Sequence, residues 1–349
     1  MSFSPKCLAT AIGSLPHAKA EDAVAVVLAN IPGAPIWPQL PANGMNEQME
    51  IQYSEALPRI VIDREKERMY IDTTGDYSMD LATFYENFLM ENVDAFAITP
   101  AFSKGIYAME AALQAAGGSR PFVKVQTTGP ISFGLTIVDE NKRAIYYNPE
   151  FIDCVVKGLA MKCRWQIQKF RGFAENVICF IDEPILSAFG SSTYVSVKRE
   201  DVVARVNEVV EAVHADGALA GVHCCGNTEW SILIDAGVDI VNFDAFGFGE
   251  TIAMYASSVK AHLNKGGLLA WGVVPTSAVI REQTVETLAA KLEHGIQHLA
   301  ATGIDKQQIA TQALITPSCG TGSLDPADAM KVFELANAVS KAMKGKYKF

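Results

Sequence analysis

Short apolar segments alternate with amphipathic stretches along nearly the whole chain, and this alternation restricts the fold more than any other feature. Such apolar runs are typical of strands that are buried on both faces of a parallel sheet. They occupy residues 9–15, 93–98, 122–127, 177–181, 218–223, 239–243, 268–274 and 310–315. Eight strands that alternate with helices predict an α/β fold, a single (β/α)8 TIM barrel. A doubly wound open sheet is the alternative, although no Gly-x-Gly-x-x-Gly motif follows the first run.

Helical patterns lie between the apolar runs. Apolar residues recur at helical spacing in segments 151–170, 201–215, 285–299 and 326–343. Asp325-Pro326 predicts the start of the last helix, with Asp as the N-cap and Pro at the first helical position. Residues 31–68 are irregular and contain several prolines, which break regular helix. We therefore expect an insertion after the first strand that packs near the top of the barrel.

The composition is that of a folded, acidic protein. Hydrophobic residues make up 49% of the 349 residues, which allows one large core in a single domain over residues 1–349. The net charge of -10 disfavours binding to nucleic acid. The 7 cysteines form no disulfide framework, and no signal peptide or bilayer-spanning apolar run of about 20 residues is visible. We therefore expect a cytoplasmic protein with no membrane partner, whose thiols are available to a metal ion.

Polar residues and glycines follow the ends of several predicted strands. In a barrel of this kind the active site lies at the carboxyl ends of the strands. The segments at these ends are Ile12-Gly13-Ser14, Thr128-Gly129-Pro130, Asp182-Glu183-Pro184, His223-Cys224-Cys225, Asp244 and Ser318-Cys319-Gly320. Because they come from different strands, we expect them to surround one site.

The segment His223-Cys224-Cys225 is the clearest chemical signal. Alternate residues of a strand point to the same side, so His223 and Cys225 face the site together and Cys224 faces away. Imidazole and thiolate are zinc ligands, and a zinc site with an open position is typical of catalysis. Cys319 joins them if the loop after the eighth strand folds across the mouth, and Asp244 on the next strand is the candidate fourth ligand. The set predicts a zinc site that ionises a thiol.

Each segment also has a purely structural interpretation. A lone His-x-Cys is often structural, because buried Cys packs as a small hydrophobe. Asp182-Glu183-Pro184 is compatible with a solvated loop that starts a helix, or with a carboxylate that binds a substrate ammonium group. Ile12-Gly13-Ser14 is compatible with a tight turn, or with backbone N–H groups that hold a carboxylate. We place in the structural class Cys7, Cys154, Cys163 and Cys179.

The ordered set of motifs resembles the catalytic C-terminal barrel of cobalamin-independent methionine synthase. The matches cover nearly the whole chain and are Ala11-Ile12-Gly13-Ser14-Leu15-Pro16, Thr128-Gly129-Pro130, Ile181-Asp182-Glu183-Pro184, His223-x-Cys225 and Pro317-Ser318-Cys319-Gly320. The resemblance implies a zinc enzyme that methylates homocysteine to methionine. It implies His223, Cys225 and Cys319 as zinc ligands, with Asp244 where the family has Glu. It also implies that the amino acid binds to Ile12, Ser14 and Asp182, with Asp76 as a candidate second acid.

The residues that bind folate in that family are not matched. Thr136 stands where the family has a folate-stacking Trp, and Ala188 lies near the position of a folate-binding Glu. The segment from Trp271 to Thr276 lacks the family's catalytic His. His223-Cys224-Cys225-Gly226-Asn227-Thr228 also resembles the uroporphyrinogen decarboxylase-like methyltransferases, which move a methyl group between a corrinoid protein and coenzyme M. The expected methyl donor is therefore methyl-folate or a methylated corrinoid protein, and the missing folate contacts are coherent with the corrinoid.

Three alternatives to homocysteine methylation remain open. The acceptor could be coenzyme M or another small thiol. The chain could instead be a uroporphyrinogen decarboxylase-like enzyme, which needs no zinc, or a zinc protein without enzymatic activity. Asp182 separates the acceptors, since an acid near the acceptor site favours an amino acid over a sulfonate, and a metal assay separates the decarboxylase.

Overall fold

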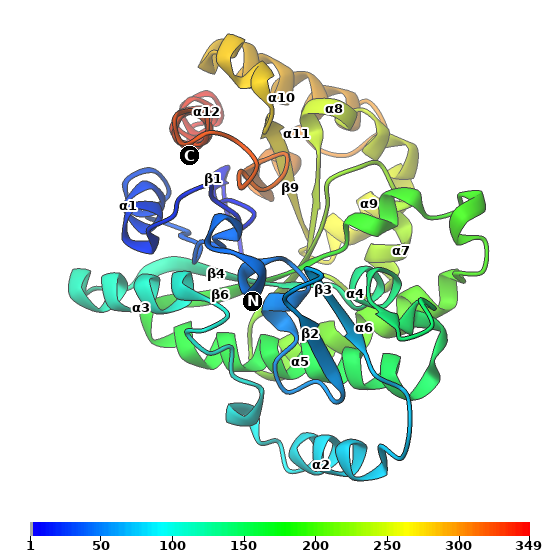
Figure 1. Ribbon diagram of the computed structural model, residues 1–349. Helices are drawn as coiled ribbons and strands as arrows, with labels where there is room; N and C mark the ends of the chain where they lie inside the picture. Colours follow the sequence, from blue (N-terminus) through cyan, green and yellow to red (C-terminus); the bar gives the residue numbers. More distant parts are fainter. Residues whose placement is uncertain (1–2) are drawn as a thin grey trace.

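The computed structural model describes residues 3–349, and its centre is a parallel sheet surrounded by helices (Figure 1). The seven strands of this sheet stand in the order β1-β10-β9-β8-β7-β6-β4. All neighbouring strands in it are parallel. The strands are β1 (Leu8–Ala9), β4 (Arg120–Thr128), β6 (Ala174–Asp182), β7 (Leu219–Cys224), β8 (Ile240–Phe243), β9 (Leu268–Val274) and β10 (Ala313–Pro317).

The strand order identifies the type of sheet. It follows the chain from β4 to β10 without a reversal and then returns to β1. A doubly wound sheet reverses its order at a switch point, so the doubly wound alternative is excluded. The predicted α/β class and parallel sheet are confirmed, and the architecture is compatible with a TIM-like fold. The regular strands nevertheless form only part of a barrel, because they do not close into an eight-stranded ring.

Residues 33–39 lie between β1 and β4, where a barrel would have its remaining strand. Their backbone is bonded to both sides: Phe122 N–H to Gly33 C=O (3.1 Å), Lys124 N–H to Pro35 C=O (2.9 Å) and Gln39 N–H to Gly13 C=O (3.1 Å). Pro35 and Pro38 have no N–H group, so they cannot continue a regular ladder. This segment therefore connects the two edges of the sheet through isolated bridges.

Two details of the predicted organisation are wrong. The apolar run 93–98 is not a strand, since Val93–Phe96 forms a 3₁₀ turn against α5 (Pro149–Phe170). The predicted insertion, residues 31–68, does not lie wholly outside the sheet, because residues 33–39 belong to its edge. The rest forms the 3₁₀ turns Pro41–Asn43, Met45–Glu47 and Ile51–Tyr53, then the hairpin β2 (Ile60–Asp63) and β3 (Arg68–Ile71), which pairs with β5 (Val138–Asp139).

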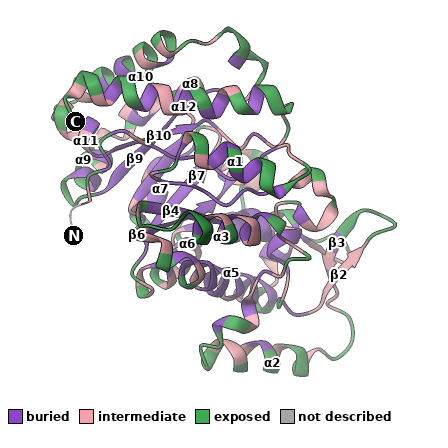
Figure 2. Cartoon of the chain, turned by 90° about the vertical axis from the view of Figure 1, so that its left-hand side faces the viewer, coloured by how far each residue is buried: buried purple, intermediate pink, exposed green. Residues whose placement is uncertain are grey.

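Helices cover the outside of the sheet, with buried residues toward it and exposed residues on their outer faces (Figure 2). The four predicted helices are confirmed as α5, α6 (Arg199–Ala215), α10 (Val285–Ala300) and α12 (Pro326–Tyr347). Asp325 caps α12 by accepting a hydrogen bond from Asp328 N–H. Among the described residues, no helix has the length and apolar character needed to cross a bilayer. The remaining α-helices are α1 (Ala20–Asn30), α2 (Ser78–Leu89), α3 (Lys104–Ala116), α4 (Pro130–Thr136), α7 (Trp230–Asp235), α8 (Ala245–Phe248), α9 (Ala256–Asn264) and α11 (Lys306–Thr311).

The inside of the curved sheet changes from apolar to polar along the strands. The inner side of the sheet carries a separate apolar cluster, which consists of Ile12, Ala34, Phe122, Ile178, Phe180, Ile240, Leu268, Ala270 and Leu314. Residues two positions further along a strand point to the same side. Two positions after the apolar residues Phe180, Ile240 and Leu314, the strands carry buried polar residues. These are Asp182, Asn242 and Thr316. The polar layer at the carboxyl ends of the strands is therefore where the site forms.

Candidate metal centre

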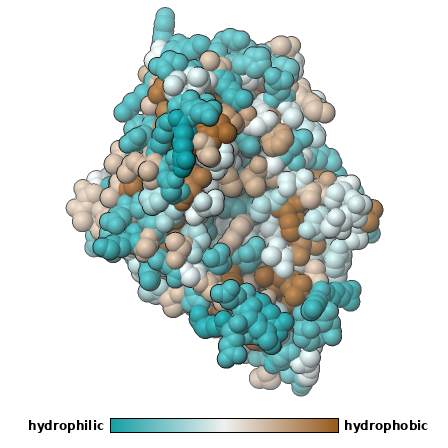
Figure 3. All heavy atoms as spheres, turned by 45° about the horizontal axis from the view of Figure 1, so that its top comes forward, coloured by the Kyte–Doolittle hydropathy of each residue, from teal (hydrophilic) through white to brown (hydrophobic). Residues whose placement is uncertain are grey.

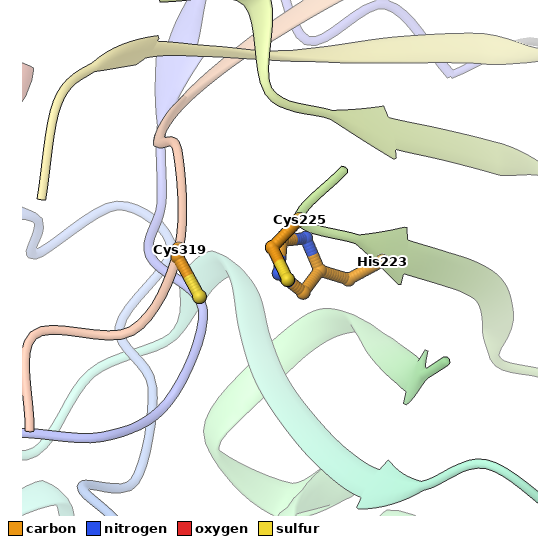
Figure 4. Close-up of side chains that lie close together, drawn as sticks. All are labelled: His223, Cys225 and Cys319. Carbon is orange, nitrogen blue, oxygen red and sulfur yellow. The ribbon is translucent and has the colours of Figure 1, made fainter. Parts of the chain in front are cut away.

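His223, Cys225 and Cys319 lie together at the carboxyl ends of the strands (Figure 4). The imidazole nitrogen and the two sulfur atoms all lie within 4.8 Å of one another. His223 is near the end of β7, Cys225 directly follows that strand, and Cys319 is in the loop after β10. Cys224 is fully buried in the outer hydrophobic core, as the alternation along the strand predicts. Three of the four predicted metal ligands are therefore brought together.

Asn242 of β8 sets the orientation of the His223 ring. Its amide NH2 donates to the Ala270 carbonyl (2.9 Å) and to Thr316 Oγ1 (2.8 Å), so its Oδ1 accepts from His223 Nδ1. This bond leaves the lone pair on His223 Nε2, which is buried and has no hydrogen-bond partner. Burial also lowers the pKa of His223 to about 4. A neutral ring with a fixed, unused nitrogen is the form that binds a metal ion.

The role of Asn242 leads to a prediction. Asn242→Leu removes the acceptor for Nδ1–H and should weaken metal binding about 10- to 100-fold, as the loss of such an outer hydrogen bond does at other metal sites. Titration of the metal against a chromophoric chelator measures this affinity. Asn207→Leu is the matched control, because the Asn207 side chain bonds to the Ala236 carbonyl on the outside of the sheet. An Asn242 variant with the affinity of the control would contradict the assigned role.

The two thiols of the cluster have different acidities. Hydrogen bonding to Cys319 lowers the pKa of Cys225 to about 7, against the opposing effect of burial. The same contact with Cys225, together with burial, raises the pKa of Cys319. The pair therefore favours a thiolate on Cys225 near neutral pH. Two sulfur donors and one imidazole nitrogen suit a soft or borderline metal ion.

Asp244, the predicted fourth ligand, is not brought to the cluster. Its carboxylate caps α8, where Oδ1 accepts a hydrogen bond from Gly247 N–H (2.8 Å). Within the described residues, the group whose ligand atoms lie within 4.8 Å of one another contains His223, Cys225 and Cys319 without this aspartate. Among the described residues, the candidate metal site therefore offers three protein donors.

A cavity of about 390 Å³ lies beside the cluster. It is lined by the three donors and by all three predicted substrate-binding residues, Ile12, Ser14 and Asp182. One face of the molecule, seen in Figure 3, is hollowed near its middle. The Oδ1 atom of Asp182 is buried without a hydrogen-bond partner. Burial raises the pKa of Asp182 to about 7, and the buried Lys124 ammonium acts in the opposite direction.

Glu47 also lines this cavity, and sequence reasoning missed it. It ends the 3₁₀ turn Met45–Glu47, is 5% exposed, and has a buried Oε2 atom without a partner. Burial raises its pKa. Asp76, the predicted second acid, instead accepts a hydrogen bond from Ser78 N–H at the start of α2. Nothing in the local sequence separates Glu47 from the other acids of this irregular segment.

Glu183 supports the site without lining the cavity. Its carboxylate accepts hydrogen bonds from the N–H groups of Ile131 (2.9 Å) and Ser132 (2.8 Å) at the start of α4. A Cβ atom on Gly129 would lie 2.1 Å from Glu183 Cδ, so this close approach requires glycine. The Thr-Gly-Pro and Asp-Glu-Pro motifs therefore form one structural unit, which holds the end of β6 and Asp182 against α4.

No protein-family model matches the chain, and no curated protein sequence matches it. The fold and the site define a mixed α/β protein with a candidate metal centre at the carboxyl ends of a parallel sheet. The resemblance to methionine synthases stays a prediction that rests on the motifs.

Proposed function

We propose that this protein is a zinc-dependent methyltransferase whose acceptor is an amino-acid thiol, with homocysteine as the substrate and methionine as the product. In this reaction the bond between the methyl carbon and the donor breaks, a carbon–sulfur bond forms, and the thiol proton goes to solvent. The electron pair of the broken bond stays with the donor, as Co(I) of a corrinoid or as the protonated amine nitrogen of a folate, so no external oxidant or reductant is needed. The observation that carries the proposal is one cavity that combines the three metal donors with two carboxylates, each of which has a buried oxygen atom without a hydrogen-bond partner.

The donor set fits zinc. Zinc binds Cys sulfur and His nitrogen, and catalytic zinc sites keep three protein ligands with one position open. His223 Nε2 is buried, neutral and without a partner, which is the state of a ligand nitrogen. Zinc bound there would supply a Lewis acid that lowers the pKa of an incoming thiol and so favours the thiolate nucleophile. The residues of the chain hold this centre and position the acceptor beside it.

The acids of the cavity favour an acceptor with an ammonium group. Asp182 Oδ1 and Glu47 Oε2 are both buried and unpartnered, and an unpaired buried polar atom costs free energy. A substrate ammonium group is the kind of partner that these oxygen atoms lack, whereas the sulfonate of coenzyme M would meet like charge. Ile12 and Ser14 line the same cavity, where the Ser14 hydroxyl is the proposed donor to a substrate carboxylate. Homocysteine is therefore favoured over coenzyme M as the thiol.

The methyl donor is proposed to be a methylated corrinoid protein, with methyl-folate as the second candidate. Thr136 and Ala188, which stand at the family's folate-binding positions, do not line the cavity. Trp271, which begins the segment without the catalytic His, is fully buried. Methyl transfer from a corrinoid needs less assistance from a protein acid than methyl transfer from folate. The loss of the folate-binding residues and of the catalytic His therefore agrees with a corrinoid donor.

The test is methyl transfer to homocysteine with methylcobalamin and methyltetrahydrofolate compared side by side. We expect methionine from methylcobalamin, loss of the activity after chelation, and its return with zinc. Coenzyme M as acceptor should give little product. Zinc-loaded protein that methylates no thiol from either donor would contradict the proposal, as would activity that survives complete removal of the metal. Decarboxylation of a porphyrinogen by metal-free protein would favour the decarboxylase instead.

A further inference from the structure

The loop that carries Cys319 has to cross the mouth of the sheet. β10 is separated from β7 by β9 and β8, so strand pairing alone does not bring Cys319 to His223 and Cys225. Figure 4 shows Cys319 arriving from a different side of the site than the other two residues. Contacts outside the sheet must therefore hold the loop, residues 318–323, in place.

Ser14, in the turn after β1, provides these contacts on one side of the loop. Its carbonyl oxygen accepts hydrogen bonds from both Thr321 N–H and Thr321 Oγ1, each at 2.8 Å. Its Oγ accepts a hydrogen bond from Gly322 N–H at 3.1 Å. Because Oγ accepts here, the hydroxyl hydrogen stays available to a ligand in the cavity. On the other side of the loop, Ser318 N–H donates to the Val274 carbonyl at the end of β9 (2.8 Å).

Two glycines allow the loop to lie directly on Ser14. A Cβ atom at Gly320 would lie 2.2 Å from Ser14 Oγ. A Cβ atom at Gly322 would lie 2.8 Å from Pro41 Cγ and 2.9 Å from Ser14 Cβ. Neither glycine has a positive φ. The glycines are therefore needed for close approach and not for an unusual backbone conformation.

We propose that Ser14, Gly320 and Gly322 form a clamp that holds Cys319 at ligand distance from His223 and Cys225. Ser14 is then a positioning residue that acts on the metal through Cys319, in addition to facing the substrate. The clamp also joins the metal centre to the segment after β1, since the Pro41 ring occupies the space that a Cβ atom on Gly322 would need and lines the same cavity as Glu47. The inference rests on the proposed metal centre but not on the proposed reaction.

Cobalt(II) added to the metal-free protein tests the clamp, because each thiolate bound to Co²⁺ adds thiolate-to-metal charge-transfer absorption. Wild-type protein should show the intensity of two thiolates, and Cys319→Ala about half of it. Gly320→Ala should show less intensity than wild type, because its methyl group meets Ser14 Oγ and either the loop or the serine side chain must move, which breaks the bond from Gly322 N–H. Ser14→Ala should give a charge-transfer intensity between those of wild type and Cys319→Ala. Ser14→Thr should restore the wild-type intensity, because it keeps the Oγ acceptor.

Matched controls separate the clamp from general damage. Gly345→Ala adds a methyl group in open space on α12, and Ser323→Ala removes a cavity hydroxyl that is not among the hydrogen-bond partners of Ser14 in the described residues. Both should keep the wild-type cobalt spectrum, and circular dichroism confirms folding of each variant. Full two-thiolate intensity in folded Gly320→Ala and Ser14→Ala would overturn the clamp. Unchanged intensity in Cys319→Ala would instead overturn the metal centre itself.

Discussion

Replacing Cys225 with alanine is expected to remove the bound metal and to lower methyl transfer to homocysteine by about 1000-fold. A catalytic metal ion lowers the activation free energy by several kcal/mol, and a change of about 4 kcal/mol in that barrier corresponds to a factor of about 1000 in rate. Cys225 supplies the sulfur of lower pKa in the cluster and lies on the cavity wall. Metal content by elemental analysis and initial rates with methylcobalamin measure the two effects.

Cys224→Ala is the matched control for this experiment. The two cysteines are neighbours in the chain, but Cys224 is fully buried on the opposite side of β7 from the cavity. The control should keep the metal and lose only some stability, because a small hydrophobic side chain is shortened. The centre would be wrongly assigned if Cys224→Ala lost the metal while Cys225→Ala kept it.

Asp182→Asn is expected to raise KM for homocysteine about 10- to 100-fold with a smaller change in kcat, since hydrogen bonds to charged groups contribute about 1.5–3 kcal/mol. The asparagine keeps the size of the side chain but removes the charge that is proposed to bind the ammonium group. Asp76→Asn is the control, because that carboxylate accepts a hydrogen bond from Ser78 N–H outside the cavity. Equal KM values for wild-type and Asp182→Asn would contradict the assignment of the ammonium site.

The raised pKa of Asp182 predicts the direction of the pH dependence. The folded-state pKa is about 7, above the ordinary value of 3.8, because burial disfavours the charged form. The carboxylate binds an ammonium group only when ionised, so KM of the wild type should fall as pH rises through about 7. The substrate-free protein should lose stability over pH 3.8 to about 7, as ionisation of the buried acid becomes a cost. Both dependences should be weaker in Asp182→Asn.

The sequence alone predicted most strands because their apolar runs are continuous, as burial on both faces demands. It was wrong at residues 93–98, since a short apolar run has the same composition in a strand and in a buried 3₁₀ turn. The segment 33–39 takes the vacant place beside β4 instead. Its prolines suggested an irregular insertion, and local sequence carries no information about which distant strand such a segment contacts.

Within the site, the sequence determined whatever depends on the alternation along one strand. It placed His223 and Cys225 on the inner side and Cys224 on the outer side, because successive side chains of a strand point in opposite directions. Only the tertiary structure decided which residues from distant segments join them. It brought Cys319 across the mouth onto Ser14, placed Asn242 behind the imidazole and Glu47 in the cavity, and left Asp244 as a helix cap. These positions depend on loop packing and pairing between strands, which no local pattern specifies.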